Sequence, residues 1–177
     1  MAGATLATAA PMSAWAKREE DSIGAINTAT FLHIVDRGLN HGDLSVIDEN
    51  VSPDMVEHQI YGVNWPTGPA AIKALVTTLR TAFPDLYCHI IDVSTAGDKV
   101  FGRAITTGSF TGNYLGVPGN GNKIYIEIHD EFRFLSHAGM DSTSRPKIIE
   151  HWGVADNLTL LIQLGLIPYK DLPAYKG

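Results

Sequence analysis

The sequence predicts an α+β fold in which helices precede a curved, mostly antiparallel sheet. Up to residue 83, apolar residues recur at helical spacing. From residue 86 onward, four segments are rich in β-branched and aromatic residues, and a short helical segment follows the last of them. Helices followed by consecutive strands are typical of α+β domains. A curved sheet that wraps around the helices is consistent with this order.

Three helices are expected ahead of the strands. Apolar residues from about 22 to 40 lie near helical spacing, and a short helix opens after Gly42-Asp43. The clearest helix starts at Thr67-Gly68-Pro69, because proline suits the first turn, and it ends at Pro84. One continuous apolar stripe runs along it, formed by Ile72, Leu75, Val76, Leu79 and Phe83.

Four strands are expected at 86–93, 100–107, 123–135 and 148–154. Gly97-Asp98 forms a turn between the first two. The composition of 116–122 indicates a loop, and 136–146 is a longer loop that we interpret as an insertion. A short helix at 157–164 should end at Gly165.

Composition limits the function only loosely. With 177 residues, 45% hydrophobic and 18% charged, the chain fits one globular domain, expected at 21–177 behind an extension at 1–20. The net charge of −6 argues against nucleic acid and anionic membranes as partners. Cys88 is the only cysteine, which excludes an internal disulfide. The first residues lack the basic segment of a secretory signal, so we expect a cytoplasmic protein.

Asp130 is the most informative residue on physical grounds. Alternation along 123–135 places it on the same face as apolar residues, where it is the only carboxylate. A carboxylate on an apolar face either has a partner or has a raised pKa, which suits a general acid or base near neutral pH. A structural ion pair is the alternative. Arg103 alternates with Phe101 and Ile105, so it is a candidate partner or a surface residue.

Asp156 has two interpretations. It directly precedes the helix expected at 157–164, where aspartate is a favoured N-cap that stabilises by about 1 kcal/mol. Its position after Trp152 also makes it a candidate acid or base once the family resemblance below is considered. Both roles are compatible only if the side chain leaves the cap and faces a cavity.

The order of several short motifs resembles the SnoaL-like polyketide cyclase (ester cyclase) family. The segment from Glu150 to Asp156, with Leu164-Gly165 downstream, carries the strongest likeness. The remaining likeness lies in Asn40-His41-Gly42-Asp43-Leu44, Val56-Glu57-His58, Gly68 with Ile72, Phe83-Pro84-Asp85-Leu86, Gly97-Asp98-Lys99-Val100 with Arg103, Gly108, Gly112, Leu115-Gly116-Val117-Pro118, Gly121, and Asp130 with Arg133. The resemblance implies a cone-shaped α+β barrel with one internal cavity.

The resemblance also implies a cofactor-independent cyclase or isomerase for a small, apolar, oxygenated polyketide- or terpenoid-like intermediate. Asp156 and Asp130 would be the acid/base pair, His58 would orient the substrate or relay a proton, and Arg103 would stabilise oxyanion charge. The expected pocket residues are Tyr61, Trp65, Phe83, Phe110, Tyr114 and Trp152. Phe110 stands where the family commonly has a histidine, which favours a more apolar substrate.

Two other function classes remain open. An epoxide hydrolase on the same fold would use two aspartates, Asp130 and Asp156, and Arg103. A non-catalytic binding or assembly module predicts a cavity without two carboxylates. His129 and His151 are expected to point outward by alternation, and the scattered histidines do not predict a metal site. We also expect a homodimer formed through the sheet, with Tyr87, Tyr125 and His129 on the covered face.

Overall fold

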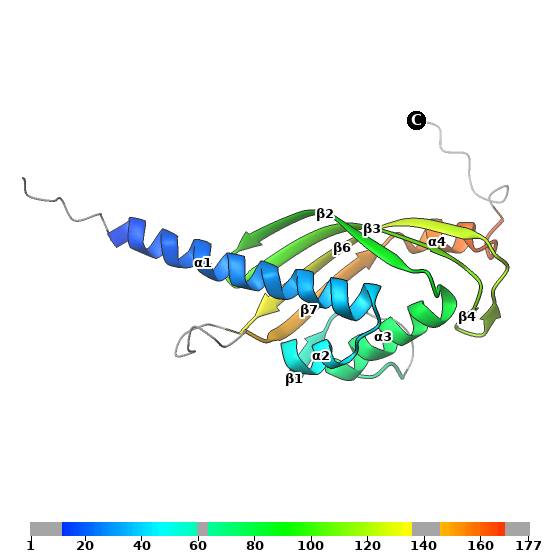
Figure 1. Cartoon of the computed structure of the whole chain (residues 1–177), viewed down its shortest axis with the longest axis horizontal. Coiled ribbons are helices and arrows are strands. Elements are labelled where there is room, and N and C mark those ends of the chain that lie inside the picture. Colours follow the sequence, from blue (N-terminus) through cyan, green and yellow to red (C-terminus); the bar gives the residue numbers. More distant parts are fainter. Residues whose placement is uncertain (1–11, 60–63, 136–145, 169–177) are drawn as a thin grey trace, which may run out of the picture.

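The computed structural model of this chain describes residues 12–59, 64–135 and 146–168 (Figure 1). Its helices are α1 (Met12–His33), the π-helix η1 (Ile34–Asn40), α2 (Ser45–Asn50), α3 (Pro69–Ala82) and α4 (Asn157–Gln163). Its strands are β1 (Val51–Glu57), β2 (Tyr87–Ala96), β3 (Lys99–Ser109), β4 (Asn113–Tyr114), β5 (Val117–Pro118), β6 (Lys123–Phe134) and β7 (Ile148–Ala155). No helix in the described ranges is long and apolar enough to cross a membrane.

The predicted helices are confirmed, with two differences at their ends. The helix expected at 22–40 is α1 followed without a break by η1, and α1 already begins at Met12, inside the segment expected as an extension. Residues 1–11 lie outside the described residues, as does the loop predicted at 136–146 except for its last residue. Helix α3 has Pro69 at its start and ends where the Phe83 N–H donates to the Leu79 carbonyl, one residue before Pro84.

The main sheet has five strands in the order β1-β7-β6-β3-β2. All neighbours are antiparallel except β1 and β7, which are parallel. The predicted curved α+β arrangement is confirmed. However, in the described part of the chain no strand joins β1 to β2, so the sheet is open rather than a closed barrel.

Strand β6 decides which face of the sheet is inside. Ile124, Ile126, Phe132 and Phe134 are buried, whereas Tyr125 between them is 63% exposed. The alternation predicted for this strand is therefore confirmed, and its even-numbered residues face the helices. The core forms two clusters, one around Phe31 and Phe134 and the other around Phe83 and Phe110.

The junction of α1 with the sheet depends on a glycine in β3. A Cβ on Gly102 would lie 2.4 Å from Cζ of Phe31, a buried residue near the end of α1. The Phe31 ring in turn lies 5.5 Å from the Phe132 ring of β6. Gly102 therefore lets the aromatic ring of α1 reach the backbone of the sheet, as the crossing of α1 over the strands illustrates (Figure 1).

We expect Gly102→Ala to lower the free energy of unfolding by about 1–3 kcal/mol, the usual cost of an overpacked core. Urea denaturation of the wild type and the variant measures this change. Phe31→Leu in the Gly102→Ala background should recover part of the loss, because the shorter side chain vacates the space that the new methyl group takes. If the losses of unfolding free energy caused by Gly102→Ala and Phe31→Leu simply add in the double variant, the proposed contact between the two residues is contradicted.

Candidate active site

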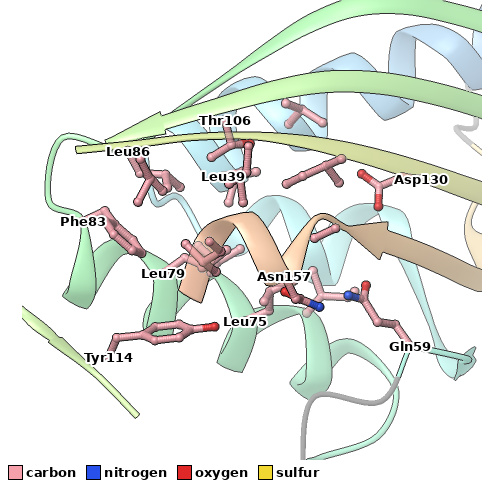
Figure 2. A pocket seen from close by; sticks show the side chains of 18 of the residues that line it. Leu39, Gln59, Leu75, Leu79, Phe83, Leu86, Thr106, Tyr114, Asp130 and Asn157 are labelled. Atoms are coloured by element: carbon pink, nitrogen blue, oxygen red, sulfur yellow. The ribbon is translucent and has the colours of Figure 1, made fainter. Parts of the chain in front are cut away.

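A cavity of about 350 Å³ lies between the concave face of the sheet and helices η1, α3 and α4 (Figure 2). Its walls are mostly aliphatic and aromatic and come from both core clusters. The apolar lining residues are Ile34, Val35, Leu39, Ile72, Leu75, Val76, Leu79, Phe83, Leu86, Leu115, Ile124, Ile126, Ile128, Phe132, Ala155, Leu160 and Leu161. The polar lining residues are Gln59, Thr106, Tyr114, Asp130, His151 and Asn157.

Asp130 reaches the cavity from the middle of β6, as the alternation predicts. Its register partners are Gly102 on β3 and Gly153 on β7, so the strands on both sides contribute no side chain next to it. The Asp130 side chain is 24% exposed. A carboxylate thus stands on an apolar sheet face where its two register partners have no side chains. Figure 2 places it across the cavity from Phe83 and Tyr114.

His151 joins Asp130 to a second carboxylate. Its Nε2 lies 3.3 Å from Oδ1 of Asp130, and its Nδ1 lies 2.8 Å from Oε2 of Glu57. The His151 and Glu57 side chains are only 3% and 5% exposed. The His151 ring also stacks on Phe132, with 4.3 Å between ring centroids. Three titratable groups from β1, β6 and β7 therefore form one buried chain.

The expectation that His151 points outward is wrong. The pairing of β7 with β6 is irregular between Phe134 and Arg133: Ile148 pairs with Phe134, Glu150 with Arg133 and His151 with Phe132. Ile149 is thus an extra residue, as in a β-bulge, and one extra residue reverses which side chains face inward. Ile148 and His151 are both buried as a result.

His151 is held in its charged form. Burial of the imidazole by itself lowers its pKa, but the hydrogen bonds and charges of Asp130 and Glu57 outweigh burial and raise the pKa from 6.5 to about 9. At neutral pH an imidazolium therefore donates hydrogen bonds to two carboxylates. Glu57 uses its other oxygen, Oε1, to accept a hydrogen bond of 2.9 Å from the backbone N–H of Gln59.

This charge arrangement gives Asp130 a definite chemical character. The imidazolium of His151 donates a charge-assisted hydrogen bond to the Asp130 carboxylate. A carboxylate that is oriented in this way and faces a mostly apolar cavity is suited to removing a proton from a bound molecule. Glu57 fixes the orientation of the imidazolium from behind, so that His151 presents Nε2 to Asp130.

Asp156 does not reach the cavity. Its side chain is exposed and accepts a hydrogen bond of 3.0 Å from the Thr159 backbone N–H at the start of α4. The Thr159 side chain and backbone both lower the pKa of Asp156 through hydrogen bonds. Of the two interpretations of Asp156, the structure therefore displays the helix cap.

Three other predicted residues lie on the outer face of the sheet or at its edge. Arg103 donates from Nε to Asp92 at 2.9 Å, and it also pairs with Glu127. The ring of His58 stacks on Trp152 at 4.3 Å, while its Nε2 lies 3.0 Å from Glu150. The bulge that turns His151 inward turns Trp152 outward. None of these three residues is among those that line the cavity.

The predicted aromatic wall is present in part. Phe83 and Tyr114 line the cavity, and Phe110 is fully buried behind Phe83, with ring centroids 5.6 Å apart. Trp65 is half-buried outside the cavity lining and donates to the Ala71 carbonyl. Tyr61 lies outside the described residues.

Sequence reasoning missed Glu57, Gln59, His151 and Asn157 as site residues. The parallel pairing that makes Glu57 and His151 register partners has no local sequence signal. The spacing of the apolar Ile148 and the polar His151 by three residues is consistent with a bulge, but it does not distinguish a bulge from an outward histidine. In the described ranges, no group of three His, Cys, Asp or Glu residues is arranged to hold a metal ion.

Comparison with known proteins defines the class to which this fold and cavity belong. The SnoaL-like polyketide cyclase family matches residues 29–164, which include all the strands and cavity-lining residues that the structure describes. The chain therefore belongs to the SnoaL-like polyketide cyclase family. No curated protein sequence matches the chain significantly.

Solved structures of the same class cover most of the chain. IdmH from Streptomyces antibioticus, a proposed polyketide cyclase, is 25% identical with a TM-score of 0.64, over 78% of this chain and 98% of its own. A proposed SnoaL-like polyketide cyclase from Jannaschia sp. CCS1 is 25% identical with a TM-score of 0.67, over 82% and 96%. AclR from Streptomyces galilaeus, a proposed hydroxylase, is 29% identical with a TM-score of 0.66, over 85% and 90%.

The buried cluster predicts how stability depends on pH. The pKa of His151 is about 9 in the folded protein and about 6.5 when unfolded, so its contribution is complete below about 6.5 and is lost as the pH rises through about 9. The loss amounts to about 3 kcal/mol. Urea denaturation at several pH values between these limits measures it.

The matched variant is His151→Gln, which keeps a polar side chain but does not titrate in this range. We expect its free energy of unfolding to be lower and to vary less between pH 6.5 and 9 than that of the wild type. If the free energy of unfolding changes equally with pH in the wild type and in His151→Gln, then His151 does not carry this pH dependence.

Proposed function

We propose that this protein is a cofactor-independent cyclase or isomerase that acts on a small, apolar, oxygenated compound by proton transfer within the cavity. One observation carries the proposal: Asp130 faces a mostly apolar cavity while the imidazolium of His151 donates a hydrogen bond to it. Membership in the SnoaL-like polyketide cyclase family supports the reaction class. A polyketide- or terpenoid-like intermediate fits a cavity of this size and polarity.

In the proposed reaction Asp130 is the base. Its free carboxylate oxygen takes a proton from a carbon next to a carbonyl group, and the electron pair of that C–H bond moves onto the carbonyl oxygen. The resulting enolate either attacks a second carbonyl carbon of the same molecule, closing a ring, or takes a proton back at a different carbon, shifting a double bond. In ring closure the π electrons of the attacked carbonyl move onto its oxygen, and Asp130 gives the proton to the alkoxide formed there. In the double-bond shift Asp130 gives the proton to the new carbon, so the base is regenerated in both cases.

His151 and Glu57 orient the Asp130 carboxylate and adjust its electrostatic environment. His151 donates a charge-assisted hydrogen bond to Asp130 and offsets much of the carboxylate's charge inside the low-dielectric cavity. Glu57 fixes the ring of His151 through Nδ1, which leaves Nε2 directed at Asp130. Both residues therefore act through Asp130 rather than on the substrate.

The epoxide hydrolase alternative receives less support from the geometry. It needs a second acidic residue to protonate the epoxide, and among the described residues Asp130 is the only carboxylate that lines the cavity. Asp156 caps α4, and Arg103 is engaged by Asp92 on the opposite side of the sheet. A non-catalytic module predicts a cavity without two carboxylates, and the described lining, with Asp130 as its one carboxylate, matches that expectation. The buried imidazolium between Asp130 and Glu57 is the observation that favours an enzyme over a binding module.

Asp130→Asn tests the proposed base. We expect turnover to fall by at least about 100-fold, the lower range for general acid–base catalysis, while the protein stays folded because asparagine keeps the shape of the side chain. Deuterium incorporation from D₂O into a panel of neutral, enolisable cyclic ketones and β-diketones, followed by mass spectrometry, measures the proton-transfer step without knowledge of the natural substrate.

Asp156→Asn is the matched control, since asparagine caps helices about as well as aspartate and the site lies outside the cavity lining. It should keep its melting temperature and its deuterium exchange. Full exchange by Asp130→Asn would remove Asp130 from the mechanism, and loss of exchange by Asp156→Asn would return the acid/base role to Asp156. Label from ¹⁸O-water in the product would indicate hydration rather than cyclisation or isomerisation.

We further propose that two copies associate through the outer face of the sheet. Tyr125 is 63% exposed, Val154 is 70% exposed and Tyr87 is 46% exposed, all on strands of the main sheet. Large apolar side chains gathered on one face are typical of an isologous interface.

Val154→Asp tests this association, because two copies of a new charge would meet at a two-fold interface. We expect the wild type to sediment as a dimer at micromolar concentration and Val154→Asp to sediment as a folded monomer. A wild type that sediments as a monomer would contradict the proposal.

A further inference from the structure

We propose that Gln59, assisted by Asn157, binds the carbonyl oxygen of the substrate and stabilises the negative charge that develops on it. This inference rests on the proposed proton transfer to Asp130. It assigns a catalytic role to two carboxamides at the polar end of the cavity, and it fixes the orientation in which a substrate binds.

The backbone of Gln59 is tied to the same cluster that controls Asp130. Its N–H donates to Oε1 of Glu57, whose Oε2 contacts Nδ1 of His151. The next hydrogen bond along this edge joins the N–H of His58 to the carbonyl of His151. The segment that leaves β1 is therefore anchored beside β7, and the side chain of Gln59 enters the cavity from there.

The side chain of Gln59 lies close to Asp130. A Cβ on Gly153 would be 2.1 Å from Oε1 of Gln59 and 2.9 Å from Oδ1 of Asp130. Both polar groups therefore lie against the backbone of Gly153, the register partner of Asp130. Because Gly153 has no side chain, the carboxamide occupies space next to the carboxylate that any other residue would fill.

Asn157 brings a second carboxamide to the same end of the cavity. It is the first residue of α4, a position fixed by the Asp156 cap, and it lines the cavity. Figure 2 shows the Gln59 and Asn157 side chains pointing toward one another, on the side of the cavity where Asp130 lies. Each carboxamide carries two N–H donors, so an oxygen atom bound between them would accept hydrogen bonds from both.

Oxyanion stabilisation has to come from neutral donors in this cavity. No Lys or Arg is among the described residues that line it. His151 is the cation of the site, but both its ring nitrogens already face carboxylates. Tyr114 lies at the other end of the cavity from Asp130, with its ring centroid 6.1 Å from that of Phe83 (Figure 2). The carboxamides of Gln59 and Asn157 are therefore the donors best placed near the base.

This placement orients the substrate. The carbonyl oxygen lies between Gln59 and Asn157, the adjacent C–H bond faces Asp130, and the apolar body extends along α3 toward Leu79 and Phe83. A donor that meets the charge only as it develops contributes roughly 100- to 1,000-fold to turnover. Among the described lining residues there is no Lys or Arg, and His151 is already paired with two carboxylates, so the cavity selects substrates that are uncharged when they bind.

The test uses 4-nitrophenol as a probe, because its ionised form carries charge on an oxygen bonded to an sp² carbon, as an enolate does, and absorbs at longer wavelength. Binding is measured in the Asp130→Asn background, where the like charge of the base is absent. We expect this protein to bind nitrophenolate and to lower the pKa of the bound phenol relative to the free phenol.

Gln59→Leu in that background removes the donors but keeps the volume of the side chain. We expect nitrophenolate binding to weaken roughly 10- to 100-fold, as for loss of a hydrogen bond to a charged group, and the pKa of the bound phenol to rise. Gly153→Ala should produce the same effect, because its methyl group displaces the carboxamide. Gln163→Leu is the matched control, since that carboxamide bonds to the Tyr125 backbone outside the cavity lining.

Two results would overturn the inference: no nitrophenolate binding by the Asp130→Asn protein, or unchanged binding after Gln59→Leu in a protein that melts like its parent. If Gln59→Leu does not fold, Gly153→Ala decides the question by the same readout. Failure of the proposed function is distinguishable, because it appears as undiminished deuterium exchange in Asp130→Asn, whereas failure of this inference leaves that exchange dependent on Asp130.

Discussion

The charged imidazole of His151, buried between Glu57 and Asp130, is the interaction on which the site depends. A buried cation is costly unless it is paired, and His151 is paired on both ring nitrogens. Because the three residues come from β1, β6 and β7, the cluster also ties together the three strands at one side of the sheet. The same contacts that satisfy the charge hold the base in place, so the stability and the chemistry of the site are coupled.

Glycines create the space in which this chemistry would occur. Asp130 stands between Gly102 and Gly153, and a different side chain packs against each glycine. The Phe31 ring of α1 lies over Gly102, and the carboxamide of Gln59 lies over Gly153. One flank of the carboxylate is therefore apolar and rigid, and the other is polar. This asymmetry defines where a hydrocarbon body and where an oxygen atom would lie in the cavity.

The family resemblance fixed the class of protein but not the distribution of roles within it. The SnoaL-like polyketide cyclase family covers the sheet and the cavity. Asp156 and Arg103, which the resemblance nominated, are satisfied by local partners: Asp156 by the first turn of α4, and Arg103 by Asp92 across the β2–β3 hairpin. A polar side chain that is already hydrogen-bonded by nearby residues would lose those bonds on entering an apolar cavity.

The sequence by itself determined the helices, four strands of the main sheet and the inward position of Asp130, because helical spacing and strand alternation are local patterns. Only the tertiary structure decided which residues meet Asp130. The pairing of Glu57 with His151 depends on β1 lying parallel to β7, and the inward turn of His151 depends on one extra residue at Ile149. Neither feature is encoded by local periodicity, since a single bulge reverses the two faces of a strand and parallel pairing joins segments far apart in the chain.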